Sequence, residues 1–189
     1  MTAENLLAAL HTAEKLKDAT RHCYTSGGRH ESVAEHSWRL ALMAYWLKDS
    51  FPDADMDKVI RMCLIHDLGE CFTGDIPTFD KTAADENREE ELLYNWVASL
   101  PAPFNAEMRA LYDEMAARET QEAKIYKALD NIEAVVQHNE SDISTWVPLE
   151  YKLNLTYGGD KAAFSPVMQA LRDVVREETL QKMAEHEQG

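Results

Sequence analysis

The sequence has few residues that break or cross-link a chain. Its 189 residues include only 7 Gly, 6 Pro and 3 Cys, and the three cysteines form no CxxC pair. A disulfide-stapled domain is therefore excluded, and free thiols suit a reducing compartment. Residues with high helix propensity, such as Ala, Leu, Glu, Met and Lys, are plentiful, and no alternating run of β-branched residues is present. This composition predicts an all-α fold.

Basic residues and long hydrophobic runs are also scarce. Lys and Arg number 19 against 34 Asp and Glu, for a net charge of -15. Such a surface does not attract polymeric nucleic acid or an anionic membrane. The N-terminal residues lack the pattern of a signal peptide, and no run approaches the ~18 apolar residues of a membrane span. We expect a soluble, cytoplasmic protein, in which a metal ion or a specific arginine would offset the charge of any anionic substrate.

Hydrophobic periodicity predicts helices along most of the chain, within one domain over 1–189. Ser32 and Glu35 have the spacing of a capping box, which puts His36 in the first turn of the helix that follows. Ser26 to Gly28 mark a loop. The helical ranges are 4–17, 33–49, 56–70, 82–99, 105–118 and 121–140, followed by a segment near 144–156 and a last helix over 161–185.

Four polar residues fall where these helices should face inward. His36 lies near a helix start, His66 and Asp67 lie near a helix end, and Asp130 lies in mid-helix. Two imidazoles and two carboxylates form a mixed nitrogen and oxygen ligand set. Such a set suits a divalent ion such as Mn, Fe, Co, Ni or Zn, and leaves coordination positions open for water and substrate.

A purely structural role is the alternative for these residues. His66 could be a core histidine bonded to a carbonyl, and Asp130 could pair with Lys127 or Lys124. The cost of burial favours the metal, because a buried carboxylate is unfavourable unless it is paired or coordinates an ion. Asp67 directly follows an apolar run, so this cost applies to it.

The segments around these residues resemble a known family. "AEHSW" with His36, "IHDLGE" with His66 and Asp67, and "KALDNIEA" with Asp130 are similar to the H…HD…D pattern of the HD-domain metal-dependent phosphohydrolases. The closer similarity, over about 16–140, is to the HD-domain 5′-deoxynucleotidases. It implies an HD-domain helical bundle with its metal-site core at about 16–140 and C-terminal helices at 144–185. The implied reaction converts deoxynucleoside 5′-monophosphates to deoxynucleosides and phosphate, in a homodimer with one divalent metal ion (Mn, Co, Zn, Fe, Ni or Mg).

The resemblance also implies a role for each matching residue. Its metal ligands fall on His36, His66, Asp67 and Asp130, its phosphate-binding arginine on Arg21, its acid-base glutamate on Glu70, and its sugar-contacting loop on Asp75, Ile76, Pro77 and Thr78. Glu70 could orient or deprotonate a water, or protonate the departing 5′-oxygen. His22 stands where a bacterial deoxynucleotidase has tryptophan, so base preference and deoxyribose selection stay open.

Two other functions remain compatible with the motifs. One is an HD hydrolase acting on another nucleotide phosphate, such as a ribonucleotide, an alarmone or a cyclic dinucleotide. The other is a non-catalytic nucleotide sensor that keeps the metal. Retention of Glu70 and of all four predicted ligands favours an enzyme over the sensor.

Overall fold

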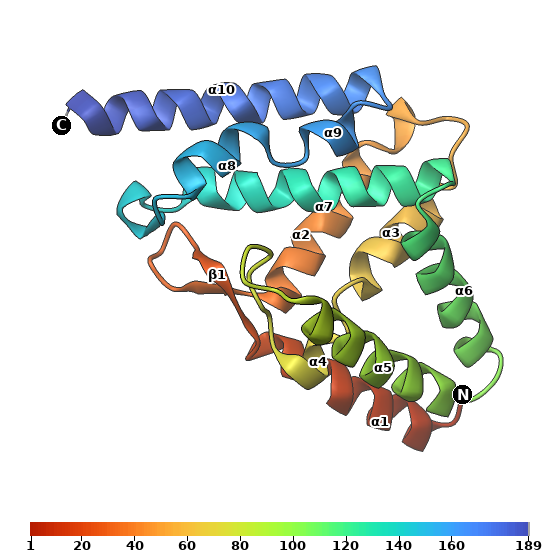
Figure 1. Cartoon of the computed structure of the whole chain (residues 1–189). Coiled ribbons are helices and arrows are strands. Elements are labelled where there is room, and N and C mark those ends of the chain that lie inside the picture. Colours follow the sequence, from red (N-terminus) through yellow and green to blue (C-terminus); the bar gives the residue numbers. More distant parts are fainter. Residues whose placement is uncertain (189) are drawn as a thin grey trace.

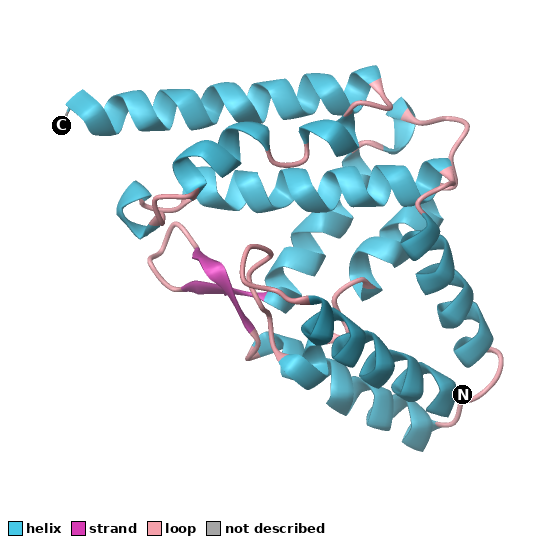
Figure 2. Cartoon of the chain, in the orientation of Figure 1, coloured by secondary structure: helices cyan, strands magenta, loops and turns pink. Residues whose placement is uncertain are grey.

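The structure, a computed structural model, describes residues 1–188. Helices account for most of it, and a short antiparallel hairpin supplies the strands (Figures 1 and 2). The helices are α1 (Ala3–Ala13), α2 (Val33–Trp46), α3 (Met56–Ile65), α4 (Glu70–Thr73), α5 (Ala83–Ser99), α6 (Phe104–Ala117), α7 (Gln121–Glu140), α8 (Glu150–Thr156), α9 (Gly159–Ala162) and α10 (Pro166–Gln188), with 3-10 turns η1 (Glu14–Lys17), η2 (Lys48–Ser50) and η3 (Ile143–Thr145). The predicted all-α class is confirmed.

Helix α7 runs through the centre of the molecule. Its apolar residues Ile125, Leu129, Ile132 and Val135 are fully buried. Helices α2 and α3 pack against one side of it, and α8, α9 and α10 lie along another (Figure 1). Residues on α2, α3 and α7 can therefore meet at one point of the core. α7 also matches its predicted range.

The segment predicted as a loop before α2 contains the hairpin. Strands β1 (Thr20–Tyr24) and β2 (His30–Ser32) pair antiparallel with an irregular register between them. Gly28 has a φ of +81° in the connecting turn, a conformation that glycine adopts without strain. The strands are too short to show an alternating pattern, which explains why composition did not predict them.

The helix predicted over 56–70 ends earlier than expected. α3 stops at Ile65, and i+3 hydrogen bonds from Leu68 to Ile65 and from Glu70 to Asp67 turn the chain before α4. The hydroxyl of Tyr112 on α6 also donates to the Ile65 carbonyl, at 2.6 Å, so this carbonyl accepts two hydrogen bonds where the helix ends. His66 and Glu70 therefore do not share one helix face.

The last predicted helix is also divided. Pro166 begins α10, where a proline needs no hydrogen-bond donor, and the short α9 precedes it. Within the described residues, no helix combines the length and the apolar character needed to cross a membrane.

Candidate metal centre and adjoining pocket

The four predicted metal ligands meet beside α7. The His66 Nε2 atom lies 3.2 Å from His36 Nε2 and 3.0 Å from Asp67 Oδ2. His36 Nε2 lies 3.2 Å from Asp130 Oδ1 and 3.8 Å from Asp67 Oδ2. Three donor atoms, from α7 and the turn after α3, thus lie within 4 Å of a fourth, His36 Nε2 on α2.

The hydrogen bonds on the far side of each ring show that this set fits a cation. His66 Nδ1 lies 2.8 Å from the Cys63 carbonyl, which can only accept, so Nδ1 carries the proton. The Nδ1 of His36 likewise faces the Glu133 carboxylate. In neutral rings both Nε2 atoms then present lone pairs to each other and to two carboxylates. A divalent ion among these four donors removes the repulsion, and nitrogen and oxygen donors are the ligands it requires.

The pKa values of groups in the centre reflect the same attraction for positive charge. Burial lowers the pKa of His66, but the carboxylates of Asp67 and Asp130 outweigh it and raise that pKa to about 10. Burial raises the pKa of Asp67, but His66 and His36 lower it overall, to about 2. Without a metal ion, protons hold the two imidazoles and the carboxylates together.

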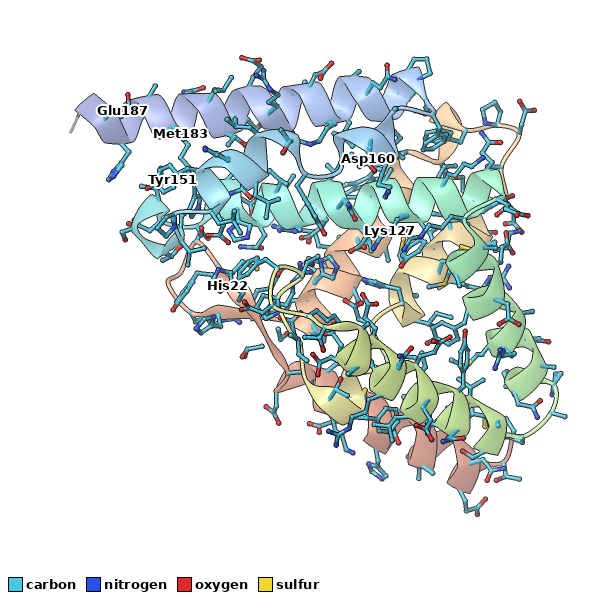
Figure 3. The ribbon with its side chains drawn as sticks, in the orientation of Figure 1. His22, Lys127, Tyr151, Asp160, Met183 and Glu187 are labelled. Atoms are coloured by element: carbon cyan, nitrogen blue, oxygen red, sulfur yellow. The ribbon has the colours of Figure 1, made fainter. Side chains whose placement is uncertain are left out.

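Asp130 makes both of the contacts that the sequence offered as alternatives. Its Oδ1 faces the two histidines, whereas its Oδ2 accepts a hydrogen bond from Lys127 Nζ at 2.7 Å. Figure 3 shows Lys127 on α7, toward the N-terminal end of that helix. The lysine orients the carboxylate without occupying the oxygen that faces the centre.

His36 is positioned from both ends. The predicted capping box is present, because Ser32 Oγ accepts from the Glu35 amide at 3.2 Å and Glu35 Oε2 accepts from the Ser32 amide at 2.9 Å. From the other side, the fully buried Glu133 on α7 binds His36 Nδ1 and accepts from Arg39 Nε at 2.5 Å. The ring of His36 is thereby fixed in both orientation and tautomer.

Arg21 on β1 lies beside this centre with an unsatisfied donor. Its Nε is 3.6 Å from Glu31 Oε2, and its Nη1 is 3.8 Å from Glu133 Oε2. Neither contact is a hydrogen bond, and the buried Nη1 has no partner among the described residues. A buried guanidinium donor without a partner is costly, and an anion would satisfy it.

Glu70 is buried at the start of α4, and its Oε2 has no hydrogen-bond partner among the described residues. Burial, together with the nearby carboxylates of Asp67 and Asp75, raises the pKa of Glu70 to about 10. The carboxyl group is then protonated at neutral pH and can donate a proton. Glycine at position 69 allows a close approach to the Glu89 side chain, because a Cβ atom there would lie 2.8 Å from Glu89 Cγ.

A pocket adjoins the centre at Arg21. The loop after α4 supplies Asp75, Pro77 and Thr78 to its wall, and β1 supplies Arg21 and His22. Of the predicted sugar-contacting loop, Ile76 does not line the pocket. Asp75 is half-buried, and burial raises its pKa although Arg21 acts in the opposite direction.

Sequence reasoning missed several residues that support the centre. Glu133 lies three positions after Asp130, next to the buried Ile132, and a carboxylate beside that apolar residue was a usable signal. Glu31 lies five residues before His36, just ahead of the capping box, and its position alone indicates no role. The pairing of Glu133 with Arg21 and Arg39 has no sequence signal, because these residues are about 100 positions apart.

Comparisons with known proteins agree with this geometry. Residues 13–172 match the HD domain family. The bovine and human proteins named 5′-deoxynucleotidase HDDC2 are each 34% identical over 142 residues, which cover 73% of this chain and 68% and 69% of those proteins. A crystal structure described as a predicted metal-dependent phosphohydrolase from Magnetospirillum magnetotacticum aligns with a TM-score of 0.80 at 29% identity, over 95% of this chain and 93% of that one.

The chain therefore belongs to the HD-domain family. Because this family contains metal-dependent phosphohydrolases, membership implies that the chain binds a divalent metal ion. The sequence motifs predicted this family, and within it a resemblance to the 5′-deoxynucleotidases, and both are confirmed.

Proposed function

We propose that this chain is a metal-dependent 5′-deoxynucleotidase, which converts deoxynucleoside 5′-monophosphates to deoxynucleosides and phosphate. The observation that carries the proposal is the convergence of four metal-type donors beside an arginine that has a buried donor without a partner among the described residues. Its relatives named 5′-deoxynucleotidase support the choice of substrate.

His36, His66, Asp67 and Asp130 would hold one divalent ion, drawn from Mn, Co, Zn, Fe, Ni and Mg. Bound there, the ion supplies a Lewis acid for a phosphate oxygen and lowers the pKa of water toward neutrality. The donor set is compatible with each of these metals, so cellular supply takes part in the choice.

Arg21 binds the phosphate of the substrate. Its planar guanidinium presents parallel donors that match two phosphate oxygens, and Glu31 and Glu133 hold it in place. This contact also explains how a chain with a net charge of -15 accepts a dianion. The positive charge is local and lies where the metal donors meet.

Glu70 acts as the acid of the reaction. Its raised pKa keeps the proton on the carboxyl group until the 5′-oxygen departs, and it then transfers that proton to the oxygen. Orienting or deprotonating the attacking water requires the ionised form, which burial disfavours.

Asp75, Ile76, Pro77 and Thr78 form the loop that faces the sugar, and Asp75 accepts a hydrogen bond from the 3′-hydroxyl. Asp75, Pro77 and Thr78 lie at the pocket wall, next to Arg21 and His22. Their position beside the phosphate-binding arginine supports this assignment. Ile76 takes part only by shaping the backbone of the loop.

We also propose that the protein is a cytoplasmic homodimer that binds no membrane and no polymeric nucleic acid. Three free, buried cysteines support a reducing compartment. On α2, Trp38, Tyr45 and Trp46 are 60%, 51% and 72% exposed, and such side chains favour an interface. Sedimentation of the purified protein over a range of concentrations tests the dimer, and a monomer throughout contradicts it.

The experiment that tests the activity measures phosphate release from a panel of 5′-deoxynucleoside and 5′-ribonucleoside monophosphates. The protein is stripped of metal and reloaded with Mn, Co, Zn or Mg. Asp130→Ala removes one proposed metal ligand, and Asp160→Ala is the matched control, because Asp160 is exposed and pairs only with its neighbour Lys161.

We expect release from the deoxy forms, loss of that release in Asp130→Ala, and wild-type activity in Asp160→Ala. Equal release from the ribonucleotides would contradict the role of the Asp75 loop while leaving the metal centre intact. An inactive wild type with metal bound would contradict the deoxynucleotidase and favour another nucleotide phosphate or the sensor.

A further inference from the structure

The pocket beside Arg21 has a second polar end that the proposed reaction does not use. Glu150, at the start of α8, is only 1% exposed, and its Oε2 accepts from the Val147 amide at 2.7 Å. Its Oε1 lies 3.0 Å from His22 Nε2 and 3.2 Å from His138 Nε2. One oriented carboxylate therefore lies close to two imidazoles at the wall of the pocket.

These contacts leave hydrogen-bonding capacity in the pocket. His22 Nε2 is near Glu150 but is not aligned for a hydrogen bond, so it has no partner among the described residues. Burial, with His22 and Arg21 nearby, lowers the pKa of His138 to about 4, so this ring is neutral at pH 7. The polar end therefore adds no strong positive charge, and it suits an uncharged polar ligand better than a second phosphate.

Asn154 on α8 is the most informative residue at this end. Its side chain lines the pocket and the residue is 2% exposed, yet its amide Nδ2 has no hydrogen-bond partner among the described residues. A buried amide donor without a partner is unfavourable, because it has lost its hydrogen bonds to water. A ligand that accepts this hydrogen bond would remove the cost.

Helix α7 relates the two ends of the site to each other. Asp130 belongs to the metal centre, Ala134 lines the pocket one turn later, and His138 lines it two turns later. At 1.5 Å per residue, His138 lies about 12 Å along the helix axis from Asp130. Figure 3 shows His22 toward the His138 end of α7, and the His22 and His138 ring centroids are 6.1 Å apart. The small side chain of Ala134 leaves the wall between them open.

Arg21, Asp75 and the residues of this polar end line one pocket, so its wall offers separate groups to the phosphate, the sugar and the base of one nucleotide. Phe79, which is 41% exposed, meets the His22 ring edge-on with centroids 5.5 Å apart, and its face is available to an aromatic ring. A planar, uncharged ring with polar edges matches both the apolar and the polar groups here.

We propose that the polar end of this pocket is a nucleobase subsite, in which the Asn154 amide hydrogen-bonds the edge of the base and His22 and Phe79 form its walls. This inference rests on the proposed function, since it assigns the remaining part of the same substrate. Asn154 is a specificity-determining residue that acts through binding, whereas the chemistry stays at the other end.

The test compares substrates with and without a base, in wild type and in Asn154→Leu. Asn139→Leu is the matched control, because the Asn139 amide donates to the Val175 carbonyl at 3.0 Å and accepts from Thr179 at 2.9 Å. We expect Asn154→Leu to lower kcat/KM for deoxynucleoside monophosphates about tenfold, through KM, since one hydrogen bond to the ligand is lost. Hydrolysis of 2-deoxyribose 5-phosphate, which has no base, should not change.

A second readout needs no turnover. Calorimetry should show that Asn154→Leu binds a 2′-deoxynucleoside without phosphate about tenfold more weakly than wild type. Its melting temperature should stay the same or rise, whereas that of Asn139→Leu should fall, because only Asn139 loses protein partners.

Three outcomes are distinguishable. Equal loss on nucleotides and on 2-deoxyribose 5-phosphate, or unchanged nucleoside binding, would overturn the base subsite while leaving the deoxynucleotidase in place. A wild type that hydrolyses none of these compounds and binds no nucleoside would overturn both proposals. Nucleoside binding that depends on Asn154 without any hydrolysis would keep the subsite and reject the enzyme.

Discussion

The metal centre and the polar end of the pocket both consist of histidines and carboxylates, but they differ in how their polar atoms are satisfied. In the centre, each histidine Nδ1 has an acceptor, and one oxygen of Asp130 is held by Lys127. At the polar end, His22 Nε2 and Asn154 Nδ2 lack hydrogen-bond partners among the described residues.

This difference separates catalysis from selection. Rigid support from α2 and α7 holds donor atoms at fixed positions, as a metal requires, and second contacts fix the tautomers. Unsatisfied donors at the other end cost stability in the free protein, so they fit a subsite that becomes satisfied only when substrate binds. Arg21 lines the pocket and lies beside the centre, and it too has a buried donor without a partner among the described residues.

The largest expected effect tests the chemical side of this comparison. Glu70→Gln replaces a protonated carboxyl group with an amide of similar shape that cannot transfer the proton, so kcat should fall by about 10²–10⁴. Metal content, measured by atomic emission, should stay at the wild-type level, because Glu70 holds no part of the donor set. Glu86→Gln on the exposed face of α5 is the matched control. An unchanged kcat in Glu70→Gln would show that Glu70 takes no part in the reaction.

A second substitution tests the support of the centre. Glu133→Gln weakens the contact to His36 Nδ1, so metal affinity should fall by about 10–100-fold. Glu140→Gln is the matched control, because Glu140 also pairs with Arg39 but is half exposed and touches no metal ligand. Competition with a chelator of known affinity measures both. If the two variants lost affinity equally, the effect would come from Arg39 and not from His36.

The four residues that the structure brings together in the centre could be singled out from the sequence because the information around each of them is local. His36 follows a capping box, His66 and Asp67 follow an apolar run, and Asp130 sits within a long amphipathic helix, so each position could be judged from its neighbours. The helix termini were harder to predict. α3 ends at Ile65, whose carbonyl also accepts a hydrogen bond from Tyr112, 47 residues later, and nothing near Ile65 in the sequence signals that contact.

The pocket could not be derived in the same way. Glu150 and Asn154 lie on a short helix whose range could be predicted only approximately, and His22 and His138, which face Glu150, come from distant elements. The structure puts His138 two helical turns from Asp130, at the wall of the pocket. Burial of a polar residue becomes informative only once the packing of α7, α8 and β1 is known.

Metal affinity at the centre should change about tenfold per pH unit, and this dependence distinguishes the centre from the polar end. Asp67 and Asp130 raise the pKa of His66 to about 10 in the metal-free protein, so a metal ion must displace a proton below that pH. Metal affinity should therefore fall about tenfold for each unit below neutrality. The same raised pKa stabilises the metal-free protein below pH ~6.5, and that contribution is lost as the pH rises through about 10. Calorimetry in buffers of different ionisation enthalpy would detect the released proton, and its absence would contradict this protonation state.

The smallest effect comes from a residue that belongs to neither region. Arg118 ends α6 with a φ of 54°, a left-handed conformation that costs a non-glycine residue free energy. Arg118→Gly should therefore raise the free energy of unfolding by about 0.5–1 kcal/mol, after the added flexibility of the unfolded chain is subtracted. Ala117→Gly, one residue earlier and still helical, should lower it by a similar amount. Chemical denaturation measures both, and because α6 carries no residue of the centre or the pocket, metal affinity and KM should stay unchanged. A change in either would mean that the site depends on the global stability of the fold.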